Sequence, residues 1–226
     1  SEFRVHNNYA KRLNTPLKYF PFLRWEKEYH WNPVLNFGLT VSTFNPVAGA
    51  NSPVDGRAYV DGTDAATTFA IIHDMVTGTG ADATAGDNAA IVHLAARAET
   101  DRYNTLIRSF FLFDTSAIPD TDTISSAVFS VYVLSVTNQL GGSHEVALVN
   151  TNPASNAAIV VGDYTDGVES LTTKQATNLT ITGMTTSAYN DWTLNATGIA
   201  NISKTGITKF GLRLEADRGN VAPTWA

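Results

Sequence analysis

The alternation of apolar and polar residues is clearest in the middle of the chain, where two successive stretches predict long strands. Residues 106–113 are dense in aromatic and branched side chains and hold no run of helix-favouring residues, which predicts a strand buried on at least one face. After Pro119, residues 126–133 alternate small or polar side chains with aromatic and branched ones, the pattern of a half-buried strand. The polar, proline-containing connection favours two strands in different sheets over a tight hairpin.

The same patterns predict a series of further short strands, separated by turns rich in glycine and aspartate. We expect strands at residues 37–44, 58–60, 67–73, 89–98, 145–150, 179–182, 192–194 and 209–215. Residues 77–88, rich in Gly, Ala, Thr and Asp, are expected to form an exposed loop, and residues 195–204 one or two helical turns. Residues 159–164 suit either a short helix or the end of a strand. The sequence therefore predicts an all-β fold, an antiparallel two-sheet sandwich.

The first part of the chain differs from everything that follows, and we expect residues 1–36 to form an extended N-terminal arm before a sandwich domain at residues 37–226. The arm holds eight aromatic residues with interspersed Arg and Lys, and its prolines exclude one continuous helix. Buried interface cores have this composition, which predicts that the arm anchors the protein to a partner subunit. The residues expected to make this contact are Tyr19, Phe20, Phe22, Arg24, Trp25, Tyr29 and Trp31. Two alternatives are that the arm folds back over its own sandwich or that it binds nucleic acid.

A resemblance to a known family rests on the stretch RSFFLFDTSAIPDTDTISSAVFSVYV at residues 108–133. It resembles the DNRLRE and carbohydrate-binding-module-like jelly rolls, whose members carry an Arg-Ser-aromatic-Leu-Phe-Asp strand, a Ser-x-Ile-Pro link and a Tyr-containing strand. Residues 52–60, 151–164 and 185–214 are similar to the variant frequent in predicted phage virion and metagenomic surface proteins. The resemblance implies a jelly-roll-like sandwich. Family members usually continue with another strand, so either a neighbour completes this sandwich or the polypeptide is incomplete.

Composition and charge exclude several classes of protein. The chain has no run of 18 apolar residues, so no transmembrane helix is expected. The absence of cysteine excludes disulfides and thiol chemistry. The first residues have no apolar core of a signal peptide, and Ser1 is either a natural start or a cloning remnant. Residues 1–31 carry six Lys and Arg against three Glu, whereas residues 32–226 carry nine against eighteen acids. The predicted sandwich is therefore acidic, which disfavours binding to nucleic acid.

The candidate chemistry is sparse. No nucleophile elbow, phosphate-binding loop, dinucleotide fingerprint or zinc-protease motif is present, and the five histidines lack ligand spacing, so we predict that the protein is not an enzyme. Carboxylates pair in turns, where they either ligate a structural Ca²⁺ or act as ordinary turn residues; no other cofactor is expected. These pairs are Asp61 with Asp64, Asp82 with Asp87, Asp120 with Asp122, and Asp163 with Asp166. Arg108 and Asp114 are candidates for an ion pair, and the alternative is that both side chains face solvent.

Tyr189 and Trp192 are the candidate ligand-binding residues, because two nearby aromatic side chains can stack on a sugar; the alternative is that Trp192 fills the core. With the resemblance, these patterns favour a non-enzymatic structural or adhesion protein of a phage-like virion. The arm would bind other virion or surface proteins, the protein would be a homo-oligomer, and the sandwich loops would face outward. The alternative is a carbohydrate-binding module of an extracellular or cell-surface protein, which would carry aromatic side chains on one exposed sheet face.

Overall fold

The computed structural model describes residues 1–11, 36–45, 54–83, 92–166 and 173–223, and in them two antiparallel sheets dominate. The strands are β1 (Glu2–Lys11), β2 (Asn36–Phe44), β3 (Asp55–Val60), β4 (Gly80–Asp82), β5 (His93–Ala96), β6 (Tyr103–Asp114), β7 (Thr123–Val133), β8 (Glu145–Asn150), β9 (Leu179–Thr180), β10 (Ala188–Thr193) and β11 (Ile207–Leu214). The helical segments are α1 (Phe69–Asp74), α2 (Asp163–Asp166), η1 (Ile181–Gly183), α3 (Ala196–Ala200) and α4 (Glu215–Arg218). The predicted all-β, two-sheet sandwich is confirmed.

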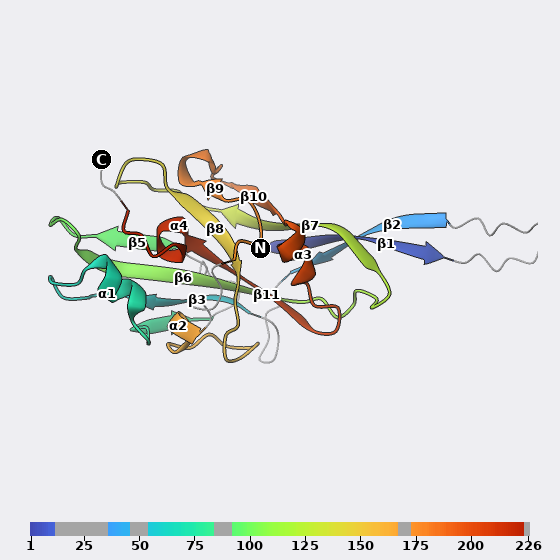
Figure 1. The fold of residues 1–226 in the computed structure, drawn as a ribbon, viewed down its shortest axis with the longest axis horizontal. Helices are drawn as coiled ribbons and strands as arrows, with labels where there is room; N and C mark the ends of the chain where they lie inside the picture. Colours follow the sequence, from blue (N-terminus) through green and yellow to red (C-terminus); the bar gives the residue numbers. More distant parts are fainter. Residues whose placement is uncertain (12–35, 46–53, 84–91, 167–172, 224–226) are drawn as a thin grey trace, which may run out of the picture.

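The two sheets face each other and each has a definite strand order (Figure 1). One sheet has four strands in the order β10-β7-β1-β2, and the other has seven, in the order β4-β3-β6-β11-β8-β9 with β5 also paired to β6. The strands β6 and β7, which follow each other in the sequence, lie in different sheets, as their connection predicted. The predicted strands at residues 145–150 and 209–215 are present as β8 and β11, respectively.

Aromatic side chains from both sheets fill the space between them. Phe129 of β7 contacts Phe111 of β6, with ring centroids 5.1 Å apart, and also packs against Trp192 of β10 and Phe210 of β11. Edge-to-face and tilted ring pairs of this kind stabilise a core beyond the area that they bury. The sandwich core therefore contains a group of contacting rings, which aliphatic side chains of both sheets complete.

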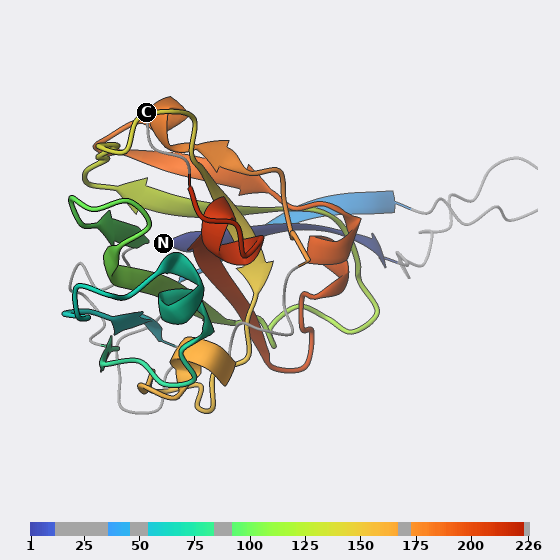
Figure 2. The same cartoon turned by 60° about the vertical axis from the view of Figure 1, so that its left-hand side comes forward.

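The seven-stranded sheet buries its other face as well, under α1, α2 and the connections around them (Figure 2). Strand β6 supplies both faces, because alternate residues of a strand point to opposite sides. Phe111 and Phe113 point into the sandwich, whereas Phe110 and Leu112 belong to a second cluster with Phe69 and Ile72 of α1 and Tyr164 of α2. This burial on both faces explains why residues 106–113 are almost entirely apolar.

The predicted boundary of the arm is corrected by strand β1. Glu2–Lys11 lies in the middle of the four-stranded sheet, antiparallel to both β7 and β2, and the side chains of Phe3 and Val5 are fully buried. Only these two residues of the ten-residue strand carry the apolar alternation, too short a signal to distinguish a strand from an extended arm. Residues 2–11 are therefore part of the sandwich.

Two local predictions are also wrong. The strand expected at residues 67–73 is mainly the helix α1, which the Thr68 side chain caps by accepting a hydrogen bond from the Ile71 N–H. Phe69 and Ile72, three residues apart, are buried on one side of this helix. The exposed loop expected at residues 77–88 contains β4, which pairs with β3, and its residues 84–88 lie outside the described residues.

A buried ionic cluster, formed by Arg108, Arg213 and Asp217, joins β6, β11 and α4. The Arg108 guanidinium donates two hydrogen bonds to the Asp217 carboxylate, of 3.0 and 2.7 Å, and the Arg213 Nε donates a third of 2.8 Å. All three residues are at most 3% exposed. The structure thereby corrects the sequence-based pairing of Arg108 with Asp114, because Arg108 is bonded to an aspartate 109 residues later in the chain.

The same guanidinium also reaches the helices that cover the sheet. Arg108 donates to the carbonyl oxygens of Tyr164 (2.6 Å) and His73 (3.0 Å), and its Cζ atom lies 4.1 Å from the centroid of the Tyr164 ring. The Tyr164 hydroxyl in turn donates to the Ile72 carbonyl, 2.6 Å away. Burial alone would raise the pKa of Asp217, but Arg213 and Arg108 outweigh it and lower that pKa, so the carboxylate stays charged.

Replacement of Asp217 by asparagine is expected to destabilise the fold strongly. The side chain keeps its size, but two buried guanidinium groups lose the carboxylate that they share. A loss of this kind costs about 3 to 5 kcal/mol in the free energy of unfolding, measurable by urea denaturation followed by circular dichroism. Asp120→Asn, an exposed aspartate, is the matched control and should change the stability little. A D217N protein within about 1 kcal/mol of the parent would contradict a central role for the cluster.

Candidate functional site

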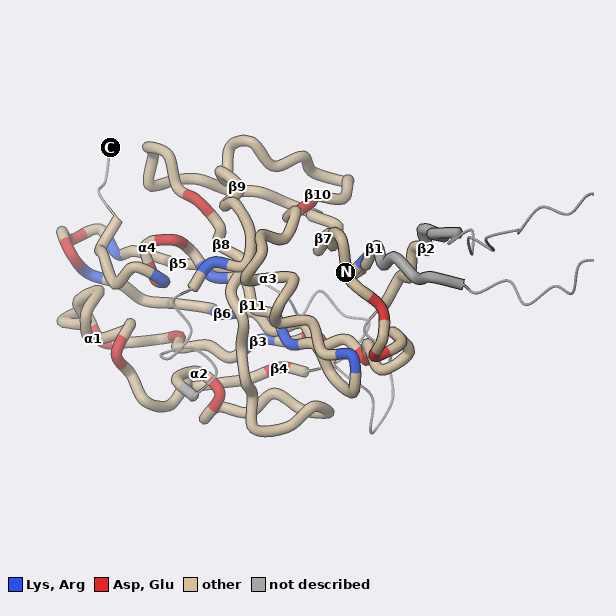
Figure 3. Tube along the Cα trace, turned by 45° about the vertical axis from the view of Figure 1, so that its right-hand side comes forward, with Lys and Arg blue, Asp and Glu red and all other residues tan. Residues whose placement is uncertain are grey.

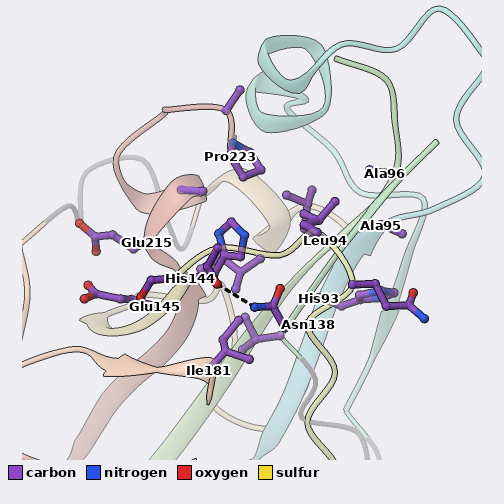
Figure 4. A pocket seen from close by; sticks show the side chains of 18 of the residues that line it. His93, Leu94, Ala95, Ala96, Asn138, His144, Glu145, Ile181, Glu215 and Pro223 are labelled. Atoms are coloured by element: carbon purple, nitrogen blue, oxygen red, sulfur yellow. Dashed lines mark hydrogen bonds between the residues drawn. The ribbon is translucent and has the colours of Figure 1, made fainter. Parts of the chain in front are cut away.

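A pocket of about 970 Å³ opens where the seven-stranded sheet divides (Figure 4). Strand β11 pairs with β6 as far as Leu212 opposite Ser109, and then follows β8 to Leu214 opposite Val146. Beyond that point β5 takes the place beside β6, with His93 opposite Ile107. We call the opening between β5 and the end of β11 the fork; α4 and the connection between β7 and β8 complete its walls.

The fork has an apolar side and a polar side. Its apolar lining comes from distant parts of the chain, namely Leu94, Ile181, Leu214, Val221 and Pro223. The polar lining includes His93, Asn138, His144, Glu145 and Glu215. The Asn138 amide donates to the Gly142 carbonyl (3.0 Å), which fixes one wall, whereas the buried Nε2 atom of His144 has no hydrogen-bond partner among the described residues.

Two carboxylates at the edge of the fork share one amide. The Asn178 Nδ2 donates to Glu145 at 2.8 Å and to Glu215 at 2.9 Å. Hydrogen bonds from Arg218, and further ones from Asn178 and Lys174, outweigh partial burial and lower the pKa of Glu215 to about 2. Glu215 is therefore an anion at neutral pH and is unsuited to donate a proton in catalysis.

Four of the carboxylates that suggested calcium have protein partners. Asp61 accepts from the Gly62 N–H and the Thr105 hydroxyl, Asp64 from the Ala66 N–H, and Asp163 from two backbone N–H groups. Asp82 forms an ion pair with Arg57, and Asp87 lies outside the described residues. Within the described part of the chain, no group of three or more His, Cys, Asp or Glu could hold a metal ion. Structural calcium stays a prediction.

Tyr189 and Trp192 cannot form one stacking platform. They are three residues apart on β10, and alternate residues of a strand face opposite ways. Trp192 is 1% exposed and its Nε1 donates to the Val146 carbonyl at 3.4 Å, so it fills the core. Tyr189 is 52% exposed, and its neighbour across the strands is Tyr132 of β7, which is 45% exposed. The two tyrosine rings lie with centroids 5.3 Å apart and planes at 78°.

Charged and hydroxyl side chains lie next to this tyrosine pair on the outer face of the four-stranded sheet. The Ser130 hydroxyl donates to the Asp191 carboxylate (2.5 Å) and accepts from Arg4 of β1 (3.2 Å). Arg4 also pairs with Glu2 at 3.0 Å. We call Tyr132, Tyr189 and this polar group the tyrosine face. Tyr132 could not be identified from the sequence, because its closeness to Tyr189 requires the register of β7 with β10.

The predicted partner-binding residues, Tyr19, Phe20, Phe22, Arg24, Trp25, Tyr29 and Trp31, lie outside the described residues. The strands on either side of them are described. The pairing of β1 with β7 ends at Asn8 opposite Thr123, but the pairing of β1 with β2 continues to Lys11 opposite Asn36. In Figure 1, β1 and β2 leave the body of the sandwich as a two-stranded ribbon.

Comparison with known proteins gives no family for the chain: no protein-family model, no curated protein and no solved structure shows a significant match. The resemblance to the DNRLRE jelly rolls therefore stays a prediction. Among the helices that the structure describes, none has the length and apolar character needed to cross a membrane. The Lys and Arg positions of the described chain lie scattered among acidic ones and form no continuous stripe (Figure 3).

Glu215 predicts a dependence of stability on pH. Its folded-state pKa of about 2 lies below its ordinary value of 4.5, so its interactions stabilise the fold fully above pH 4.5 and are lost as the pH falls toward 2. We expect the difference in the free energy of unfolding between the parent and Glu215→Gln to shrink over that interval. The change should be smaller than the lowered pKa of Glu215 alone implies, because solvent screens this partly exposed carboxylate. Urea unfolding at several pH values measures it, and a difference that stays constant would contradict the assignment.

Proposed function

We propose that this protein is a non-enzymatic structural and adhesion component of a larger assembly, of the kind found on a phage-like virion. The observation that carries the proposal is the β1–β2 ribbon, whose pairing continues to Lys11 opposite Asn36 after the pairing of β1 with β7 ends at Asn8. A two-stranded ribbon that continues beyond its sheet is suited to contact a second molecule. Attachment outside a host cell, in a virion or on a surface, is the location that this role implies.

The composition of the segment that the ribbon carries supports the same role. Residues 12–35 contain six aromatic residues and four Lys or Arg, a combination enriched in the buried parts of protein interfaces. Both ends of the segment are attached to paired strands at Lys11 and Asn36. A contact made there is thus transmitted to the four-stranded sheet through two hydrogen-bonded strands, which resists displacement better than a single flexible arm.

The test is to remove the segment without touching the sandwich. Deletion of residues 1–36 would remove the buried Phe3 and Val5, so residues 12–35 should instead be replaced by Asn-Gly, a turn that closes two-residue hairpins. We expect the shortened protein to keep its unfolding transition and to lose self-association, measured by sedimentation velocity, and incorporation into particles, seen by electron microscopy. A control that changes only Phe20, Phe22 and Trp25 to serine should give the same loss. Unchanged assembly of both proteins would refute the proposal.

A second candidate function, carbohydrate binding, is favoured by the tyrosine face. Sugars bind through their apolar faces to aromatic rings and through their hydroxyl groups to charged side chains, and both kinds of group are adjacent here. Tyr132 and Tyr189 provide exposed rings, while Asp191 and Arg4 provide exposed hydrogen-bonding groups that Ser130 holds in place. This would make the protein a glycan-binding module, or would provide the adhesive surface of a virion component.

Removal of either tyrosine ring tests the carbohydrate function. If a glycan array identifies a ligand, Tyr132→Ala and Tyr189→Ala should each weaken its binding by about tenfold, as loss of a central aromatic contact does. The affinity is measured by isothermal titration calorimetry. Val41→Ala, a change at an exposed position on β2, is the control and should leave the affinity unchanged. Absence of binding to every sugar, or ligand binding unaffected by both tyrosine substitutions, would remove this candidate.

A further inference from the structure

The fork contains an open strand edge. In the described part of the chain β5 pairs only with β6, so its other edge has no strand beside it. On β6, the Leu112 N–H bonds to the Val54 carbonyl, and the Asn104 carbonyl accepts from the Thr63 N–H. The backbone N–H and C=O groups of these even-numbered residues therefore point away from β5. Ile107 and Thr105 of β6 therefore make the hydrogen bonds to β5, whereas the register shifts between Ala95 and Ala96, and the Tyr103 N–H opposite Ala96 bonds to the Thr67 carbonyl instead.

This alternation identifies which backbone groups of β5 face the fork. His93 and Ala95 are opposite Ile107 and Thr105 of β6 and bond to them, as the Arg97 N–H bonds to the Arg102 carbonyl at 2.7 Å. The N–H and C=O groups of Leu94 and Ala96 are then directed to the other edge, into the fork. A partner that satisfies them must offer donors and acceptors at the spacing of an extended backbone.

Beneath this open edge the fork continues into the apolar interior of the sandwich. A second cavity of about 560 Å³ lies between the two sheets and shares Val92, Thr137, Ile181 and Leu214 with the fork. Its inner lining includes core side chains of both sheets, among them Phe111, Val146, Trp192 and Leu212. An extended segment along β5 would direct every second side chain toward this apolar floor and the others toward the polar rim.

We propose that the fork binds an extended segment of another polypeptide chain, which adds to β5 as a strand. The segment carries apolar side chains at alternate positions, because these enter the cavity between the sheets. It also carries a Lys or Arg at the end that lies near Glu145, whose carboxylate is held by the Asn178 amide. The backbone edge selects a peptide over a sugar or a small apolar molecule, neither of which offers a regular row of amides.

The fork and the ribbon are separate surfaces, so the two proposals can fail independently. The fork lies beside α4 and the last described residues, at the end of the molecule away from the ribbon (Figure 1). Removal of residues 12–35 should leave peptide binding at the fork intact, and blocking the fork should leave the contacts of the ribbon intact. Strand addition at the fork therefore involves a different partner from the one that contacts the ribbon.

The proposal is tested with a displayed library of random peptides of about nine residues, the length of a typical strand. We expect selection on the full chain to enrich sequences that alternate apolar and polar residues. Addition of a selected peptide should slow hydrogen exchange of the Leu94 and Ala96 amides and leave the Ala95 amide unchanged, since that amide is already bonded to β6. Chemical synthesis and fluorescence anisotropy then give the affinity of each selected peptide.

Substitutions at the open edge provide the decisive comparison. Ala96→Pro removes one N–H that faces the fork and should weaken the peptide at least about tenfold, while a proline there spares the bonds to β6. Because that protein could fold poorly, Leu94→Asp provides a second variant that places a charge in the apolar lining of the fork and should also abolish binding. Asp120→Asn, an exposed position between β6 and β7 that does not line the fork, should bind as the parent does. The proposal is overturned if no alternating peptide is enriched, if Leu94 and Ala96 exchange as before, or if both variants bind normally.

Discussion

The buried contact of Asp217 with Arg108 and Arg213 determines how the parts of this molecule fit together. A single carboxylate joins two strands of the seven-stranded sheet, and Arg108 extends the connection to the carbonyl oxygens of α1 and α2. Charges taken out of water are costly unless each is paired and hydrogen-bonded, so this arrangement permits only one position for α4 relative to β6. The cluster contributes a specific geometry in a fold whose remaining contacts are largely apolar and less directional.

Local patterns of sequence predict the strands that are buried on both faces or that alternate clearly. Residues 106–113 and 126–133 carry such patterns, and β6 and β7 follow them closely. Strand β1 could not be predicted, because only Phe3 and Val5 mark its buried side and its remaining residues suit an exposed segment. Helix α1 was not predicted, because the apolar run that follows its capping residue, Thr68, satisfies a strand pattern and a helix pattern equally well.

The candidate sites depend on which distant segments pair with each other, and a single sequence does not reveal this pairing. The proximity of Tyr189 and Trp192 along the chain suggested one platform, but strand geometry separates them and brings Tyr132 to Tyr189 instead. Likewise, Arg108 finds its counter-charge 109 residues away rather than at the end of its own strand. In each case the missing information was the register or the fold topology.

The fork is best understood as a consequence of the ionic cluster. Asp217 reaches Arg213 four residues earlier and Arg108 on the neighbouring strand only if the chain leaves the sheet after Leu214 and turns into α4. Strand β11 therefore stops accompanying β6 at Leu212, and β5 occupies the vacated edge without a neighbour on its far side in the described chain. The cluster that fixes the fold thus also opens the sheet, and the same constraint keeps the two walls of the fork in place. A preformed opening of this kind lowers the conformational cost of adding a strand, since only the incoming segment has to become ordered.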